Sequence, residues 1–436
     1  MDKVVLAYSG GLDTSVSIKW IPEKYGLQVI TLTVDVGSER DLQEIQAKAL
    51  KIGATKALVV DAREVFVKYF VFPALQSGAL YQGVYPLATA LARPLIAKLL
   101  VDVAREEGAV AVAHGCTGKG NDQVRFDVAI STLAPDLRII APVREWRMTR
   151  GEEIAYAQRH GIPVSATVQG PYSVDLNLWG RSVECGILED PWAEPPEEVF
   201  AWTVNPARSP GQPRYLEIDF EKGIPVALDG RPMDGVSLIG ELNASGGEHG
   251  VGRIDHIEDR LVGIKSREVY EAPAAVILHQ AHAALEAMTM AKDALAFKSL
   301  VASRYAELVY NGLWYSSLHQ DLAAYVASSQ RHVTGTIRVK LFRGNCQVVG
   351  RCSPKSLYSH SLATYDQADA FDHSAALGFI KLWGLPTKTQ AQVQFLGEPP
   401  AELLSISPPR KGKESLSEAE AQRLGPSELD AIPEED

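Results

Sequence analysis

The sequence predicts an α/β fold in which a domain built on a parallel β-sheet is followed by an α+β domain and a C-terminal arm. Short apolar runs, typical of strands buried on both faces, alternate with helical patterns up to about Gly161. The pattern then changes to hairpins and long helices. Strands and helices that alternate at this interval form parallel βαβ units, whose ligands bind beyond the C-terminal ends of the strands.

The first strand is expected at residues 3–8 (KVVLAY), a nearly continuous apolar run. A helix is expected over 42–52, because apolar residues recur there at helical spacing and Gly53 follows. The same reasoning predicts further helices at 12–20, 92–107 and 123–132. It predicts further strands at 29–34, 57–60, 110–113 and 138–141.

The second half of the chain reads differently. Residues 163–215 are rich in Pro, Gly, Ser and Trp and show no clear periodicity. We then expect a hairpin at 215–226, long helices at 272–297 and 303–328, a strand, RGN turn and strand across 334–349, and a short helix at 376–382. The polar, acidic end of the chain is predicted to be disordered. The expected domains are 1–165, 166–375, a C-terminal oligomerisation arm at 376–398, and a tail at 399–436.

Composition narrows the class of protein. The chain has 436 residues and a net charge of -11, and an acidic chain is a poor general binder of nucleic acid. Its four cysteines, at 116, 185, 346 and 352, form no C-x-x-C pair, which argues against a disulfide scaffold or a structural zinc site. No apolar stretch approaches the ~20 residues of a membrane span, and the N-terminus does not read as a signal peptide. The sequence predicts a cytoplasmic protein with neither nucleic acid nor membrane as a partner.

The first chemical motif is Ser9-Gly-Gly-Leu-Asp-Thr-Ser15, directly after the opening strand. Glycines allow a tight turn and a close approach to a ligand, and the helix start that follows presents N–H groups to an anion. We interpret this loop as a phosphate site; the alternative is a plain turn with Asp13 as the helix N-cap. The heptapeptide resembles the PP-loop of the ATP pyrophosphatase superfamily, whose members cleave ATP between its α- and β-phosphates.

The second motif spans residues 114–126 (HGCTGKGNDQVRF) and also links a strand to a helix. Asn121 and Arg125 are four residues apart and share one helix face. Arg125 can hold a carboxylate, Asn121 suits an amide or ureido group, and Asp122 can accept from an ammonium group. The alternative is a flexible surface loop with a solvated arginine.

The two motifs together resemble the argininosuccinate synthase family. The similarity covers about residues 3–385 and includes the following segments: Tyr85, 92–94 (ARP), 171–175 (PYSVD), 189–192 (EDPW), 250–255 (GVGRID), 265–267 (KSR), 305–310 (YAELVY) and 378–381 (GFIK).

The resemblance implies a ligand for each group of residues. ATP would be held by Ala7, Tyr8, Ser9, Gly10, Gly11, Leu12, Asp13, Thr14, Ser15, Val34 and Gly115. Aspartate would be held by Thr117, Asn121 and Asp122. Citrulline would be held by Tyr85, Asn121, Arg125, Ser173, Ser182, Glu258 and Tyr270. Some positions depart from the family pattern, with Ala90 where many members have Ser, Val34 against the adenine, and Cys116 in place of Ala.

The resemblance also implies a reaction in two steps. Citrulline is adenylated by ATP with release of pyrophosphate, and aspartate then displaces AMP to give argininosuccinate. Mg²⁺ is expected on the phosphate oxygens, and Lys119 is our candidate for closing on the phosphates. Asp122 is our candidate for holding the attacking amine and for helping to deprotonate it. The family further implies a homotetramer.

Two alternatives are kept beside this interpretation. One is another AMP-forming PP-loop enzyme, such as a tRNA-thiolating enzyme, and the other is a non-catalytic ATP sensor. Two further groups are interpreted as structural. His279 and His282 are expected to pack rather than bind metal. The aromatic residues of the helical stretch are expected in the core or in a subunit interface: Tyr305, Tyr310, Trp314 and Tyr315.

Overall fold

The structure is a computed structural model that describes residues 1–38, 41–163, 171–365 and 370–394. The chain divides into two compact units, residues 1–358 and residues 359–436. The predicted disorder of the 399–436 tail lies outside the described residues. Among the described residues, no helix combines the length and the apolar character that crossing a membrane requires.

The N-terminal part of the first unit holds a five-stranded sheet whose neighbouring strands are all parallel. Its strands are β1 (Lys3–Ala7), β2 (Gln28–Asp35), β3 (Lys56–Asp61), β4 (Ala111–Ala113) and β5 (Arg138–Ile140). They are arranged in the order β3-β2-β1-β4-β5. The predicted α/β class with a parallel sheet is confirmed.

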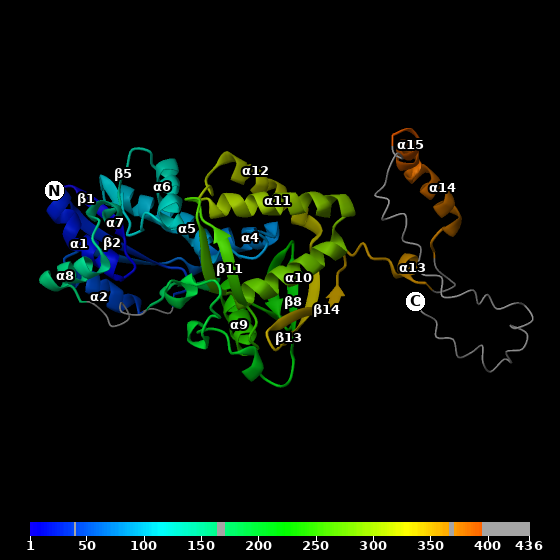
Figure 1. The fold of residues 1–436 in the computed structure, drawn as a ribbon, viewed down its shortest axis with the longest axis horizontal. Helices are drawn as coiled ribbons and strands as arrows, with labels where there is room; N and C mark the ends of the chain where they lie inside the picture. The colour runs from blue at the N-terminus through cyan, green and yellow to red at the C-terminus, as the bar shows by residue number, and fades with distance from the viewer. Residues whose placement is uncertain (39–40, 164–170, 366–369, 395–436) are drawn as a thin grey trace, which may run out of the picture. The chain divides into compact units, whose positions relative to one another are not determined.

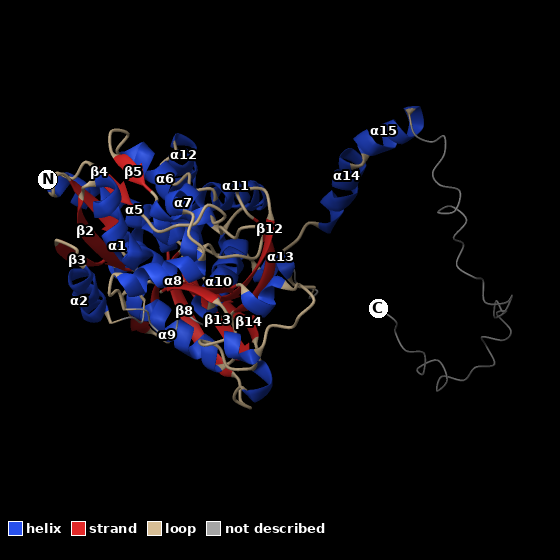
Figure 2. Cartoon of the chain, turned by 60° about the vertical axis from the view of Figure 1, so that its left-hand side comes forward, coloured by secondary structure: helices blue, strands red, loops and turns tan. Residues whose placement is uncertain are grey.

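Helices cover both faces of this sheet (Figures 1 and 2). Val4 and Leu6 of β1 pack with α1 (Leu12–Tyr25), α2 (Leu42–Ile52) and α8 (Arg150–Arg159), in a core that also includes Trp146 of the short α7 (Pro142–Trp146). Val5 faces the other way, toward α5 (Ala88–Glu106) and α6 (Asn121–Leu133). Successive side chains of a strand point to opposite faces, so a strand buried on both sides must be apolar throughout.

The strand order reverses at β1. The chain first winds outward to β2 and β3, and then returns to the other side of β1 to form β4 and β5. The loops that follow β1 and β4 therefore leave neighbouring strands at the same edge of the sheet. In open α/β sheets this reversal point is where ligands bind.

The remainder of the first unit contains two antiparallel sheets. The smaller one, in the order β11-β12-β7-β6, comprises β6 (Ser173–Asn177), β7 (Gly180–Glu184), β11 (Arg253–Asp259) and β12 (Lys265–Glu271). The larger one, in the order β10-β9-β8-β13-β14, comprises β8 (Arg214–Glu221), β9 (Ile224–Leu228), β10 (Arg231–Pro232), β13 (Gly335–Phe342) and β14 (Asn345–Cys352). The hairpins predicted at 215–226 and 334–349 correspond to β8–β9 and β13–β14.

Helices complete this unit around one large apolar core. Those between β3 and α5 are α3 (Arg63–Phe66), a π-helical turn (Val67–Val71) and α4 (Phe72–Ser77). The later ones are α9 (Gly235–Glu248), α10 (Pro273–Thr289), α11 (Lys292–Tyr310) and α12 (Ser317–Ser329). Short 3₁₀ turns lie at 186–189, 197–199, 206–208 and 330–332.

The predicted division into helices 272–297 and 303–328 is wrong. α11 runs unbroken through this gap, and the chain instead breaks at Ala291 and after Tyr310. The apolar pattern is interrupted by Lys298, which is nevertheless buried at 3% exposure because its Nζ pairs with Glu286 at 2.6 Å. Because Lys298 is charged, the sequence pattern did not indicate that the buried face of α11 continues through this position.

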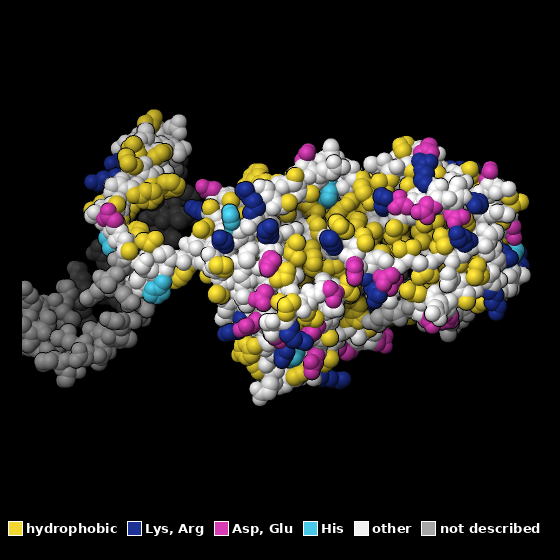
Figure 3. Space-filling view, turned by 180° about the vertical axis from the view of Figure 1, so that it is seen from behind, with side chains coloured by type: hydrophobic (Ala, Val, Ile, Leu, Met, Phe, Trp, Pro, Cys, Tyr) yellow, Lys and Arg dark blue, Asp and Glu magenta, His cyan; other side chains and the backbone are white. Residues whose placement is uncertain are grey.

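The second unit contains α13 (His360–Ala363), α14 (His373–Trp383) and α15 (Leu385–Val393). The short helix predicted at 376–382 lies within α14. Several apolar side chains of α14 are exposed, and hydrophobic side chains are visible on this helical segment in Figure 3. They are Leu377, Phe379, Ile380, Leu382 and Trp383.

Candidate active site

The PP-loop connects the end of β1 to α1, as predicted. Gly10 has a φ of +76°, and a Cβ there would lie 3.2 Å from Ile45 of α2, so the turn requires glycine. Gly11, not Asp13, is the N-cap of α1, so the alternative with Asp13 as the cap is wrong. The first N–H groups of α1 therefore open onto the loop, as an anion site requires.

Hydroxyl groups and a lysine hold this loop in shape. Tyr8 Oη and Ser15 Oγ are 3.1 Å apart, and Ser9 Oγ accepts from Gly11 N at 3.3 Å. Lys48 Nζ donates to the carbonyl oxygen of Gly10 at 2.7 Å, which ties that oxygen to α2. These contacts constrain the conformation of the loop.

The second loop leaves β4 and meets the first. A Cβ on Gly115 would lie 2.7 Å from Thr14 Cγ2, so the two loops touch at a point where only glycine fits. His114 is buried, and its Nε2 lies 2.7 Å from an oxygen of Asp127 in α6. Thr117 and Lys119 are exposed at the tip of the loop.

Asp122 lies in the first turn of α6 between two arginines. One of its oxygens accepts from Arg93 of α5 at 2.8 and 2.9 Å, and the other accepts from Arg125 at 2.9 Å. Arg93 also pairs with Asp175 of β6. Burial by itself would raise the pKa of Asp122, but the two guanidinium groups outweigh this effect and lower the pKa.

Arg125 is 4% exposed, and two of its three nitrogens are bound. Nη1 donates to Asp122, and Nε donates to the carbonyl oxygen of Tyr310 at 2.9 Å. Nη2 is buried and has no hydrogen-bond partner in the part of the chain that the structure describes. A buried guanidinium nitrogen without a partner is costly, and a ligand carboxylate is the group that would satisfy it.

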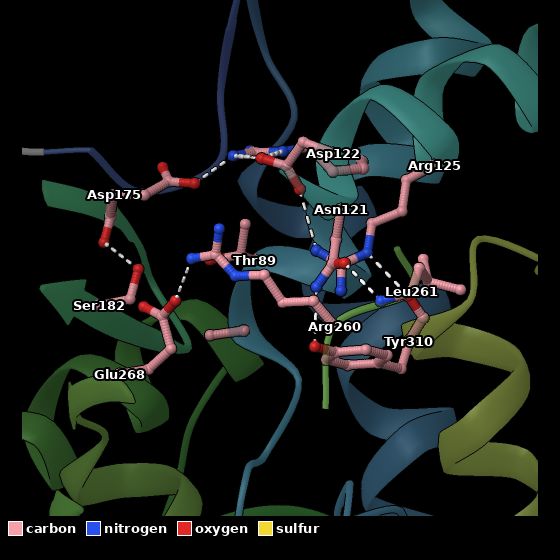
Figure 4. Close-up of polar contacts among 12 residues, drawn as sticks. Thr89, Asn121, Asp122, Arg125, Asp175, Ser182, Arg260, Leu261, Glu268 and Tyr310 are labelled. Atoms are coloured by element: carbon pink, nitrogen blue, oxygen red, sulfur yellow. Dashed lines mark hydrogen bonds and ion pairs between the residues drawn. The ribbon is translucent and has the colours of Figure 1, made fainter. Parts of the chain in front are cut away.

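A hydrogen-bonded chain of side chains adjoins Arg125, and Figure 4 shows its first bond, from Asn121 to Tyr310. Asn121 Nδ2 donates to Tyr310 Oη at 2.7 Å, and Tyr310 donates to Glu258 at 2.7 Å. The other oxygen of Glu258 accepts from Tyr270 at 2.7 Å. The ring of Tyr270 in turn stacks on Tyr85, with their centroids 4.3 Å apart.

The structure brings the predicted citrulline and aspartate residues together to different degrees. Asn121, Asp122, Arg125, Glu258 and Tyr270 are joined by the contacts above. Tyr85 joins them by stacking, and its hydroxyl accepts from Thr89 N at 3.0 Å.

The two predicted serines are placed differently. Ser182 donates to the carbonyl oxygen of Asp175 at 3.4 Å, and both residues are drawn in Figure 4. Ser173 lies at the exposed start of β6.

Three departures from the family pattern can be located. Val34 is half-buried between two apolar cores. Ala90 is fully buried within α5. Burial raises the pKa of the Cys116 thiol, which makes its thiolate rarer than usual.

Sequence reasoning missed three polar side chains of this cluster. Arg93 and Asp175 were noted only as parts of similar segments, and Tyr310 was assigned to the core or an interface. Tyr310 is indeed fully buried, but its hydroxyl bonds to two predicted citrulline residues. The predicted packing role of His282 fits its position, 1% exposed and 2.8 Å from Gln330 Oε1.

Comparison of the chain with known proteins identifies one family. Residues 3–163 match the arginosuccinate synthase N-terminal HUP domain, and residues 172–390 match the C-terminal domain of the same family. The chain belongs to the argininosuccinate synthase family.

Relatives of high identity carry that name. The argininosuccinate synthase of Dehalococcoides mccartyi strain 195 is 60% identical over 393 residues, which cover 90% of this chain and 97% of that protein. Those of Symbiobacterium thermophilum and Oceanobacillus iheyensis are 59% and 57% identical, over 90% of this chain and 98% and 94% of theirs.

As a member of this family, the chain is a ligase that condenses citrulline with aspartate and forms AMP, a reaction of arginine biosynthesis. ATP as a substrate is consistent with the family. This activity excludes the two alternative functions considered from the sequence, a tRNA-thiolating enzyme and a non-catalytic ATP sensor.

Proposed function

We propose that ATP lies across the two glycine loops, with citrulline against Arg125 and aspartate against Asp122. The observation that carries this assignment is the buried, unpartnered Nη2 of Arg125, which lies beside a carboxylate already held by two arginines. The PP-loop and the loop that contains Gly115 touch at the reversal point of the parallel sheet. Both features support a site in which phosphates and amino-acid carboxylates lie close together.

The ATP residues act by binding and neutralising charge. The helix start after Gly11 and the hydroxyls of Ser9, Thr14 and Ser15 would receive the pyrophosphate end of ATP, since N–H and O–H groups donate to phosphate oxygens. Val34 would contact the adenine. Lys119, exposed on the second loop, would close on the phosphates.

The citrulline residues fit the two ends of an amino acid. Nη2 of Arg125 would receive the α-carboxylate. Glu258, whose oxygens accept from two tyrosine hydroxyls, would accept from the α-ammonium group. Asn121, Tyr85, Tyr270, Ser173 and Ser182 would complete the site.

Asp122 is proposed as the charge partner of the aspartate ammonium group, together with Thr117 and Asn121. Because its pKa is lowered, its carboxylate remains ionised at neutral pH and is a weak proton acceptor. Its role is therefore to hold the amine rather than to deprotonate it.

The proposed chemistry follows from this arrangement. The ureido oxygen of citrulline bonds to the α-phosphorus while the bond to the β-phosphate oxygen breaks, which releases pyrophosphate. The aspartate amine then bonds to the ureido carbon, the C–O bond to AMP breaks, and the amine proton passes to solvent. Catalysis rests mainly on positioning and charge neutralisation.

Mg²⁺ is proposed as the companion of ATP rather than as a resident metal of the protein. The described residues contain no cluster of three or more His, Cys, Asp or Glu side chains that could hold a metal ion. Mg²⁺ in such sites keeps several waters and binds phosphate oxygens of the substrate.

The central test follows AMP and pyrophosphate with each substrate omitted in turn. With ATP and citrulline alone, we expect pyrophosphate release equal to about one turnover, since the adenylate has no acceptor. Adding aspartate is expected to give continuous AMP formation. Pyrophosphate release that depends on aspartate but not on citrulline would contradict the proposed order.

A homotetramer is proposed on the exposed apolar side chains of α14, among which Leu382 and Trp383 are each 74% exposed. The double variant Leu382→Glu/Trp383→Glu is expected to sediment as a smaller species than the wild type. The control variant Lys381→Ala should sediment as the wild type does. An unchanged size in the double variant would contradict a role for this helix.

The domain boundaries 1–165, 166–375, 376–398 and 399–436 also stay a proposal, which limited proteolysis tests. A cytoplasmic location is proposed in the same sense, and fractionation of cells tests it.

A further inference from the structure

Tyr310 ends α11, and its backbone and side chain contact three residues of the proposed citrulline site. Its carbonyl oxygen accepts from Arg125 Nε at 2.9 Å, and the Arg125 guanidinium lies over its ring, 4.8 Å from the centroid. Its hydroxyl accepts from Asn121 and donates to Glu258, each at 2.7 Å. These partners come from α6 and β11, and Tyr310 is their common neighbour.

The hydrogen bonds around Tyr310 have a fixed direction. Leu261 N donates to Asn121 Oδ1 at 2.9 Å, so the amide of Asn121 must present its NH₂ group to Tyr310. The Tyr310 hydroxyl accepts there, which leaves its own proton for Glu258. Because Glu258 accepts two tyrosine hydroxyls, the orientation of its carboxylate is set by Tyr310 and Tyr270 together.

The ring of Tyr310 is equally constrained. It is fully buried and stacks on Tyr81, with centroids 3.6 Å apart and planes inclined by 4°. The backbone after it approaches α6 closely, since a Cβ on Gly312 would lie 2.8 Å from Arg125 Cα. Neither the ring of Tyr310 nor the C-terminal end of α11 can shift without moving Arg125.

We propose that Tyr310 is a positioning residue that orients Asn121, Arg125 and Glu258 to receive citrulline. The inference rests on the proposed citrulline site and assigns no contact between Tyr310 and the reacting atoms. Its hydroxyl fixes the donor and acceptor directions of Asn121 and Glu258, and its carbonyl oxygen occupies Nε so that Nη2 of Arg125 is the nitrogen left for a ligand.

The test compares Tyr310→Phe with a matched control on the same helix. Tyr305 is also fully buried, but its hydroxyl has no hydrogen-bond partner among the described residues, so Tyr305→Phe removes a hydroxyl without breaking a bond. For Tyr310→Phe we expect the KM for citrulline to rise roughly tenfold or more, because bonds to a carboxylate and to a site amide are lost. The KM for ATP should remain within about twofold of the wild type. Tyr305→Phe should leave both values unchanged.

The outcomes separate this inference from the proposed function. If the wild type forms AMP only with citrulline and aspartate, yet Tyr310→Phe has the wild-type KM for citrulline, the positioning role is wrong. Equal rises in the KM for citrulline and for ATP would also overturn it, since that indicates general loosening. If Tyr310→Phe melts near the assay temperature, both variants and the wild type are titrated well below that midpoint. A wild type that releases no AMP would instead reject the function itself.

Discussion

Arg93 places two nitrogens, Nε at 2.9 Å and Nη2 at 2.8 Å, on a single carboxylate oxygen of Asp122. The residues come from α5 and α6, so this contact joins the two helices that cover one face of the parallel sheet. Arg125 binds the other oxygen, and the carboxylate is held from both sides. A group held in this way is suited to orient a cationic ligand.

Asp122→Asn is expected to raise the KM for aspartate by about 10- to 100-fold, since a hydrogen bond to a charged group contributes roughly 1.5–3 kcal/mol. Pyrophosphate release in a single turnover with citrulline should be kept. Rapid-quench assays of AMP and pyrophosphate measure the two steps separately. Asp102→Asn, a half-buried position on α5 that pairs with Lys98, is the control. Equal slowing of both steps would contradict a role confined to aspartate.

The lowered pKa of Asp122 also sets a pH dependence. A carboxyl whose pKa is depressed stays ionised above that pKa and loses its charge only as the pH falls through it. We therefore expect the KM for aspartate to be nearly constant from about pH 6 to pH 8, where ordinary carboxyls are ionised too. A KM that rises through this range on acidification, and does so less in Asp122→Asn, would show that the pKa is not depressed.

Gly115→Ala is expected to weaken ATP binding. The added Cβ would lie 2.7 Å from Thr14 Cγ2, so the two loops must move apart. We expect a rise in the KM for ATP of roughly tenfold, because overpacking costs about 1–3 kcal/mol. Gly118→Ala is the control on the same loop, since nothing lies within 4 Å of its Cβ position. Similar values for the two variants would argue against close contact between the loops.

Lys119→Ala tests the proposed closure on the phosphates. Removing one cation from developing phosphate charge typically lowers kcat by about 100-fold or more. We expect this fall in AMP formation, with thermal stability unchanged because Lys119 is exposed. Lys98→Ala, another exposed lysine that pairs only with Asp102 among the described residues, should retain the wild-type rate. Unaltered AMP formation in Lys119→Ala would exclude the role.

Glu153 of α8 gives a pH-dependent stability. It is 5% exposed, and burial together with the nearby carboxyl of Asp13 raises its pKa to about 8. A carboxyl with a raised pKa stabilises the fold below its unfolded pKa, and this contribution is lost as the pH rises through about 8. Glu153→Gln should therefore gain in melting temperature relative to the wild type at alkaline pH, and gain less at acidic pH. A difference between the two proteins that does not change with pH would contradict the raised pKa.

Much of the parallel sheet could be predicted because its strands are apolar on both faces. Val4, Val5 and Leu6 are all fully buried, and each contributes to the apolar run that marks the strand. The four-stranded sheet was not predicted, because buried residues follow no regular pattern along its strands. In β11, for example, the one buried residue is Glu258, which is polar. Without an apolar run or a regular alternation, such a strand resembles a loop.

The sequence by itself determined the two loops and the helix that carries Asn121, Asp122 and Arg125, because these residues are close along the chain and the spacing of Asn121 and Arg125 places those two on a common face. Only the tertiary structure decided what surrounds them. Tyr305 and Tyr310 are both buried side chains of α11 and are indistinguishable by pattern, yet only Tyr310 contacts Asn121 and Glu258, which lie 189 and 52 residues away in the chain. Hydrophobic periodicity reports which side of a helix is buried, whereas the partner of a buried hydroxyl depends on how distant elements pack.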